Sequence, residues 1–400
     1  MIHADGRAAD APRGMAPKPS ASVTSGGRAL FCLVLVALGG LLCQSRLGMD
    51  ALWDTANYHF FLGWAAWHGV FYDLGAVAQY HTFLNPLLDV ANYLMFGLHP
   101  YAGAVFHALA LGIAAALLWR LGEILLPAPG RAGIALVGLA VLVGTTGAMT
   151  VSLLGSWTNE NLTAVLVLIG LLCVVRALDG NRALPWAWSG VAFGVALGLK
   201  LTTAHYALAA AAVVAVCGRQ RAQALSIFGL GAIAGFIAID GAFMLLRWQA
   251  VANPVFPLAN SWFASPYFPR HALSFTEFDW RQLPFYLSLP WQWLGAGTFS
   301  EAKEVRDGRL LLGFVGIALM AIAARRERRL PRPAVAIAVF FVVAFVGWIF
   351  TMRVYRYLVG LEMLSGLLLM TGLWCAAGNL GGRRAALCMG GGVLGLCFLA

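Results

Sequence analysis

Long apolar runs recur along this chain, and they constrain its fold more than any other feature. A helix that crosses a bilayer needs about 20 consecutive apolar residues, and the sequence supplies roughly ten or eleven such runs. The composition agrees, because 60% of the 400 residues are hydrophobic, 11% are charged and the mean hydropathy is +0.78. Soluble domains are only about half apolar and about a quarter charged. We therefore predict an all-α integral membrane protein with about 10–11 transmembrane helices.

The apolar runs leave room for one membrane domain and a polar tail. Residues 1–27 are rich in Gly, Ala, Pro and Ser, which predicts a disordered cytoplasmic tail. Residues 28–400 are expected to form a single polytopic domain. Its first run, Arg28–Leu47, is interpreted as a retained span because the sequence lacks a signal-peptide cleavage pattern. The run Ala385–Ala400 is expected to be a final span.

The basic residues indicate how the spans are oriented. With the N-terminus in the cytoplasm, every inward loop carries Arg or Lys, and these loops hold 16 of the 27 basic residues. They are Arg7, Arg13, Lys18, Arg28, Arg131, Arg176, Arg182, Arg219, Arg221, the cluster from Arg325 to Arg332, Arg383 and Arg384. This is the positive-inside pattern of membrane proteins. A net charge of +10 that is spread over separate short loops does not predict a nucleic-acid groove.

Two long segments then lie on the outer side, at about residues 48–100 and about residues 249–307. The second is rich in aromatic residues and proline, which predicts an ordered lid at the membrane surface. Within the first, the apolar piece Phe83–Leu98 is short and contains Pro86 and Asp89. It is therefore interpreted as interfacial or re-entrant, and counting it as a span would place every later arginine loop outside.

The stretch directly after the first apolar run holds carboxylates that a membrane anchor does not need. If this stretch continues as a helix past Gly48, Asp50, Asp54 and Asn57 share one face. The aromatic residues that follow are typical of a helix lying in the headgroup layer. Asp54 lies between Trp53 and those aromatic residues, and no membrane anchor requires an acid there.

Further polar residues stand at the outer ends of other apolar runs. His59, His81 and Asn85 belong to the first outer loop, and their irregular separations show none of the usual metal-binding patterns. Together with Asn57, these residues are candidates for substrate binding, and so are Asn159, Glu160, Lys200, Arg353 and Arg356. The last three are cations on the side that the positive-inside rule disfavours, and they could converge on one phosphate. We expect Arg353 and Arg356 to share one helical face.

These features resemble the GT-C class of membrane glycosyltransferases, which includes the aminoarabinose transferases and the protein O-mannosyltransferases. The resemblance rests on the two acids after span one, the interfacial helix from Asn57 to His68, the turn "GLKLT" and the late "RVYRYL". It covers most of the chain in layout. Two departures stand out: the acids are four residues apart, where many members have an adjacent pair, and no soluble C-terminal domain is expected after the last span.

The resemblance implies a polyprenyl-phosphate-sugar-dependent, inverting transferase with no cofactor, although a divalent cation remains conceivable. Asp54, or otherwise Asp50, would be the general base, while Lys200, Arg353 and Arg356 would hold the lipid phosphate. The partners would be the lipid-linked donor, membrane lipids and an envelope glycan, lipid or protein as acceptor, with no nucleic acid. The implied location is a bacterial inner membrane, with the N-terminus in the cytoplasm and the active site on the periplasmic or extracellular side.

Two other classes of function stay open at this point. An O-antigen polymerase or ligase would share the many spans and the large outer loop, but would use later arginines and a histidine in place of an acid after span one. A transporter or lipid flippase would show paired halves and broken helices. The three classes are distinguished by whether Asp54, Lys200 and Arg356 face one cavity.

Overall fold

The computed structural model describes residues 24–48, 52–72, 75–126, 130–178, 180, 182–270, 278–295, 306–326, 330–351 and 353–377. Within these ranges the protein is helical and contains no β-strand. The predicted tail and the predicted last span, Ala385–Ala400, lie outside the described residues, apart from the helical start of the first helix at Ser25.

The helices fall into a body of long apolar elements and a set of short elements. The longer ones are α1 (Ser25–Leu47), α3 (Leu87–Leu98), α4 (Pro100–Leu125), α5 (Gly130–Thr145), α7 (Glu160–Ala177), α8 (Ala183–Leu199), α9 (Ala204–Cys217), α10 (Arg221–Val251), α13 (Arg309–Arg325), α14 (Arg332–Ile349) and α15 (Val359–Ala377). The shorter ones are η1 (Thr55–His59), α2 (Phe60–Trp67), η2 (Gln79–Phe83), α6 (Ala148–Ser152), η3 (Leu201–Thr203), α11 (Asn260–Phe263), η4 (Trp280–Gln282), α12 (Leu283–Gln292) and η5 (Tyr355–Leu358).

Six described segments are long and apolar enough to cross a membrane: Ser25–Leu47, Pro100–Leu125, Glu160–Ala177, Arg221–Val251, Arg332–Ile349 and Tyr355–Ala377. Four shorter apolar helices accompany them, and Leu87–Leu98 is one of these. The prediction of an all-α, multi-pass membrane protein is therefore confirmed. The number of ten or eleven spans stays a prediction.

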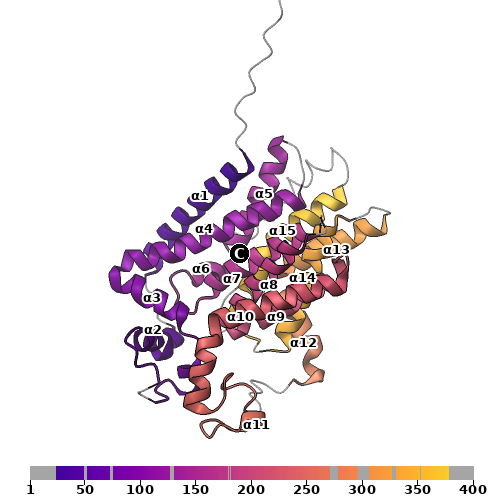
Figure 1. Cartoon of the computed structure of the whole chain (residues 1–400). Coiled ribbons are helices and arrows are strands. Elements are labelled where there is room, and N and C mark those ends of the chain that lie inside the picture. Colours follow the sequence, from indigo (N-terminus) through magenta and orange to yellow (C-terminus); the bar gives the residue numbers. More distant parts are fainter. Residues whose placement is uncertain are drawn as a thin grey trace, which may run out of the picture.

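Helix α15 forms the centre of the body, and α1 and α10 lie at its edges. Every residue from Val359 to Leu373 is buried, because α13, α5, α14, α4 and α7 all pack against α15. By contrast α1 rests mainly on α4, and α10 mainly on α8, at the edges of the body (Figure 1). The outer faces of α1 and α10 present exposed leucine, and that of α10 also presents isoleucine. Such faces suit contact with lipid.

Small residues allow α8 and α10 to approach closely. A Cβ atom added at Gly190 would lie 2.0 Å from the carbonyl oxygen of Phe228, and one added at Gly231 would lie 2.4 Å from that of Ala187. This is the small-residue packing typical of membrane helices. Near the end of α8, a Cβ atom added at Gly198 would lie 3.2 Å from the carbonyl oxygen of Phe236, so this end, where Lys200 follows, also packs on the middle of α10.

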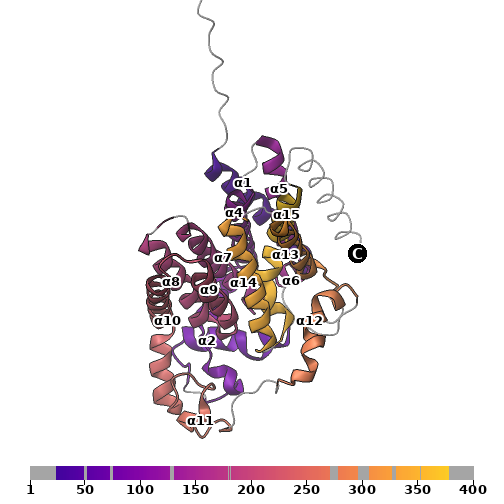
Figure 2. The same cartoon turned by 90° about the vertical axis from the view of Figure 1, so that its right-hand side faces the viewer.

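The short elements α2, α11 and α12 gather at one end of the helical body in both views (Figures 1 and 2). Trp53, Trp67, Trp262 and Trp291 on or beside these elements are more than half exposed. Exposed tryptophan is typical of the level at which membrane proteins meet the lipid headgroups. The polar residues of the candidate site lie toward the same end of the helical body.

Candidate active site

A cavity of about 780 Å³ opens among segments that are far apart in the sequence. Its walls come from residues 53–59, the loop 79–89, the ends of α7 and α8, the middle of α10, the loop 255–258 and the turn before α15. Asp54, Lys200 and Arg356 all line it. A volume of this size fits the usual range of small-molecule and cofactor sites.

Asp54 reaches the cavity from the start of a new helix, and this corrects one expectation from the sequence. Helix α1 ends at Leu47, and Gly48 has a φ of 79°, so the helix does not continue through the predicted stretch. Helical structure begins again at Trp53, and a π-helical turn, η1, then adds one residue per turn. Asp50 lies outside the described residues.

Arg356 holds Asp54 through a short ion pair. Its Nη2 atom lies 2.5 Å from Oδ2 of Asp54, and the two side chains are 8% and 13% exposed. The same guanidinium lies over the ring of Tyr357, 5.3 Å from the ring centre. The acid of the first outer segment and the arginine before the last helix are thus neighbours, although 302 residues separate them.

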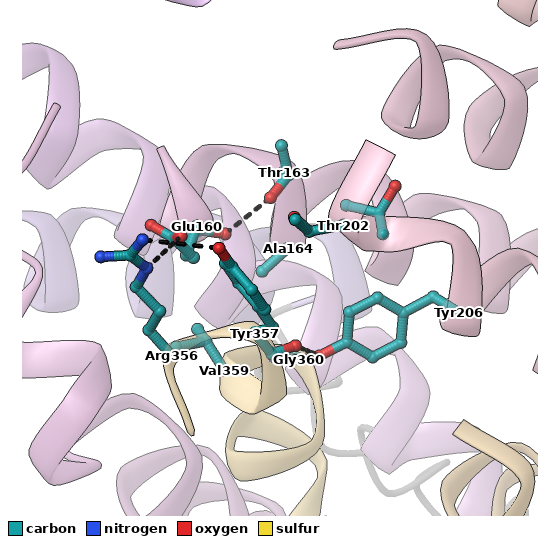
Figure 3. A pocket seen from close by; sticks show the side chains of 10 residues that line it. Glu160, Thr163, Ala164, Thr202, Tyr206, Arg356, Tyr357, Val359 and Gly360 are labelled. Carbon is teal, nitrogen blue, oxygen red and sulfur yellow. Dashed lines mark hydrogen bonds and ion pairs between the residues drawn. The ribbon is translucent and has the colours of Figure 1, made fainter. Parts of the chain in front are cut away.

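Glu160 connects Arg356 to Lys200. One carboxylate oxygen, Oε1, lies 2.6 Å from Nζ of Lys200 and 3.2 Å from Nε of Arg356. Figure 3 shows Glu160 and Arg356 facing each other beside Tyr357, at the edge of a small pocket. Glu160 is 4% exposed and is not among the residues that line the large cavity, so it lies behind the two cations.

Lys200 stands where α8 ends and the chain turns through η3 into α9. Its ammonium also donates to the carbonyl oxygen of Thr158 and lies 5.7 Å from the ring centre of Tyr357. Burial lowers the pKa of Lys200, and the carboxylate of Glu160 is the strongest influence in the opposite direction. The protonated form therefore depends on this partner.

Arg353 does not share a helical face with Arg356, which corrects a second expectation. Arg353 has a φ of 54°, and η5 begins only two residues later, so the two side chains leave the backbone in different directions. The guanidinium of Arg353 lies over the ring of Tyr286, 4.8 Å from its centre. Arg353 is not among the residues that line the cavity.

A chain of buried hydrogen bonds begins at His59. Nδ1 of His59 lies 2.8 Å from Oδ1 of Asp89, which also accepts from the amide of Asn159 at 3.1 Å. Asn159 in turn accepts from Asn92 at 2.7 Å, and Asn92 bonds to His107 at 2.9 Å. This network ties η1, α3, α4 and the start of α7 together at the cavity wall, because His59, Asp89 and Asn159 all line the cavity.

His81 and Asn85 line a different part of the cavity. The ring of His81 stacks on Tyr58 with 4.3 Å between the ring centres, and burial lowers the pKa of His81. The amide of Asn85 donates to Asp240 at 3.0 Å, and Asp240 pairs with Arg247. Asn57 is exposed, donates to the carbonyl oxygen of Trp53 at 2.7 Å and is not among the cavity-lining residues.

Asp89, Asp240 and Arg247 also line the cavity, although the sequence patterns assign them no role. The sequence does contain a signal for Asp240 and Arg247. They are an acid and a base seven residues apart within the apolar run of α10, and this spacing places them on one helical face. Ionisable residues at membrane depth are costly and mark functional sites by default. Among the described residues there is no group of three or more His, Cys, Asp or Glu that could hold a metal ion.

Fold and cavity together define a class of protein: a multi-pass membrane protein in which acids, a lysine and two arginines surround a large cavity. Comparison with known families shows that the model of the dolichyl-phosphate-mannose-protein mannosyltransferase family matches residues 81–243 of the chain. The protein is thus a GT-C glycosyltransferase that uses a polyprenyl-phosphate-linked sugar donor. The resemblance found in the sequence is confirmed, and the transporter alternative is set aside.

The matched region covers a little under half of the chain. It contains Lys200 and Glu160 but neither Asp54 nor Arg356, so the family match leaves the general base unassigned. No curated protein and no solved structure matches the chain.

Proposed function

We propose that the protein transfers a sugar, with inversion, from a polyprenyl-phosphate donor to an envelope acceptor at the outer face of a bacterial inner membrane. Asp54 is the general base, and Lys200 and Arg356 bind the donor phosphate. One observation carries the proposal: these three side chains, from three distant segments, line the same cavity. The arginine loops that the positive-inside rule assigns to the cytoplasm support an outer location.

The reaction proposed is a single displacement at the anomeric carbon. The acceptor hydroxyl oxygen forms a bond to that carbon while the bond from the carbon to the phosphate oxygen breaks. The hydroxyl proton goes to the Asp54 carboxylate. The leaving polyprenyl phosphate gains negative charge, which Lys200 and Arg356 stabilise where it develops. Attack from the face opposite the phosphate inverts the configuration.

The existing ion pair between Asp54 and Arg356 sets the order of events in this scheme. While Arg356 holds Asp54, the ion pair occupies Oδ2 of the carboxylate, so this oxygen cannot accept the proton of the acceptor hydroxyl. A donor phosphate that takes over the guanidinium frees Asp54 for the acceptor. The base becomes available only when the donor is in place.

The test compares the envelope glycans of cells that lack the protein with those of cells that carry it or its Asp54→Asn variant. Mass spectrometry should find one sugar missing without the protein, and still missing or reduced about 100- to 10,000-fold with the variant, as for loss of a general base. The control is Asp279→Asn, which changes an exposed aspartate that caps η4. Normal glycans in cells carrying Asp54→Asn would reject Asp54 as the base.

A further inference from the structure

The buried carboxylate of Glu160 connects Lys200 and Arg356, and it lies on the side of these cations that faces away from the cavity. Oε1 of Glu160 contacts both Nζ of Lys200 and Nε of Arg356, whereas Glu160 itself is absent from the cavity lining. The two cations line the cavity in front of it. Glu160 therefore reaches the donor through its partners and not by direct contact.

The backbone around Glu160 fixes where this carboxylate points. Asn159 adopts the left-handed conformation, with a φ of 70°, and Glu160 begins α7 directly after it. The hydroxyl of Thr163 donates to the carbonyl oxygen of Glu160 at 3.0 Å. Asn159 is in turn held by Asp89 and Asn92. The side chain at position 160 thus starts from a backbone that several hydrogen bonds hold in place.

We propose that Glu160 is a positioning residue that holds Lys200 and Arg356 side by side as one phosphate-binding pair and keeps Lys200 protonated. This inference rests on the proposed role of the two cations in binding the donor phosphate. It assigns to Glu160 a role other than the direct substrate contact expected from the sequence.

The electrostatic reason is that two neighbouring cations repel each other, and a carboxylate that contacts both of them offsets this repulsion. Lys200 faces Glu160 from α7, Arg356 and Tyr357 from η5 and, at longer range, Asp89 from α3. Burial and Arg356 both disfavour the ammonium form of Lys200. Glu160 is the main group that opposes them, so its removal should separate the two cations and favour a neutral lysine.

The pH dependence of phosphate binding has a definite sign. Lys200 binds an anion through its charge only below its pKa, so affinity for phosphate falls as the pH rises through that pKa. Burial already lowers the pKa of Lys200, and loss of Glu160 lowers it further. In the Glu160→Gln variant the affinity should therefore begin to fall at a lower pH than in the wild type.

The experiment measures binding of a plain polyprenyl phosphate to the full chain in lipid nanodiscs between about pH 6 and about pH 10. Glu160→Gln should bind polyprenyl phosphate at least about 10-fold more weakly at neutral pH. The loss of affinity with rising pH should also begin at a lower pH than in the wild type. Adding Lys200→Arg to this variant should abolish the decline, because arginine stays protonated throughout the range. Glu160→Asp should lie between wild type and Glu160→Gln.

The matched control is Glu123→Gln, which removes a carboxylate that pairs with Arg28 and Arg120 far from the cavity. It should leave polyprenyl phosphate binding unchanged. If Glu160→Gln fails to fold, Glu160→Asp gives the same test, because its shorter side chain cannot reach both cations at once. If the affinity of Glu160→Asp for polyprenyl phosphate begins to fall at a lower pH than that of the wild type, the inference is supported. If the two pH profiles of affinity coincide, the inference is rejected.

Two failures can be told apart. If Lys200→Ala and Arg356→Ala bind polyprenyl phosphate as tightly as the wild type, the proposed phosphate site is wrong. If those two variants weaken binding while Glu160→Gln keeps both the affinity and the pH profile of the wild type, the positioning role alone is wrong. Tighter binding by Glu160→Gln would also overturn it, because Glu160 would then compete with the phosphate for the cations.

Discussion

Two buried arginines line the same cavity, and both pair with an aspartate, yet their other partners differ. Arg247 on α10 pairs with Asp240 and donates to the carbonyl oxygens of Phe83 at 3.1 Å and Pro254 at 2.8 Å. Arg356 pairs with Asp54 and contacts a second carboxylate, that of Glu160. One arginine thus bonds mainly to the main chain, and the other bonds to side chains.

The difference separates a structural contact from an exchangeable one. Main-chain carbonyls move only if the chain moves, so Arg247 fixes the loop before α3 and the loop after α10 onto the same helix. Carboxylate side chains can turn away when a better anion arrives, so Arg356 can pass from Asp54 to a phosphate. Burial and charge alone would not distinguish these two arginines.

Arg247→Ala should have the largest effect on the stability of the protein. The variant leaves Asp240 buried without its cation and frees two carbonyl groups, and breaking a buried pair costs roughly 3–5 kcal/mol. Thermal unfolding of the purified protein should show a clearly lower midpoint, with faster proteolysis in the loop after α10. An exposed arginine, Arg281, provides the control Arg281→Ala. An unchanged midpoint would remove the distinction between the two arginines.

Arg356→Ala should act mainly on donor binding. Hydrogen bonds to charged groups contribute about 1.5–3 kcal/mol, so affinity for polyprenyl phosphate should fall about 10- to 100-fold. Lys200 still neutralises Glu160 in this variant, so the unfolding midpoint should drop less than in Arg247→Ala. Titration in nanodiscs, with the unfolding midpoint measured on the same sample, checks both parts. Equal loss of stability in the two variants would contradict the comparison.

The sequence predicts the helical membrane class well, because runs of apolar residues are a property of the chain itself. It also predicts Asp54, Lys200 and Arg356 as candidates, since each is a charged residue where apolar runs end. What it cannot supply is local backbone geometry. The break at Gly48, the π-helical turn after Asp54 and the left-handed Arg353 each change where side chains point, and helical periodicity assumes none of them.

The sequence also does not show which charged side chains pair with one another. Nothing near Glu160 indicates that its carboxylate serves two cations from the ends of other helices, because those contacts arise only when α7, α8 and η5 meet. Asp240 and Arg247 are the exception. Their spacing of seven residues on α10 predicts that they pair. A search for acids and bases seven residues apart within apolar runs would find them.

Asp54→Asn should tighten the binding of plain polyprenyl phosphate, by about 2- to 10-fold. The wild-type carboxylate competes with the ligand for Arg356, and an amide competes less because it carries no charge. The measurement is the same nanodisc titration, with Asp279→Asn as the control for loss of one acid. The predicted increase in affinity is informative because a variant that merely damaged the site would bind polyprenyl phosphate more weakly. Weaker binding by Asp54→Asn would show that the carboxylate orients Arg356 and does not compete for it.

The smallest effect on donor binding is expected from Arg353→Ala. This guanidinium lies over Tyr286, outside the cavity lining, and a cation–π contact contributes about 0.5–2 kcal/mol to stability. The unfolding midpoint should therefore fall slightly, while affinity for polyprenyl phosphate changes less than about 3-fold, far less than the loss expected from a charged hydrogen bond to the phosphate. Arg353 and Arg356 stand three residues apart, so a titration of both variants compares neighbouring arginines of different function. A loss at Arg353 as large as that at Arg356 would place both cations on the donor, as the sequence alone suggests.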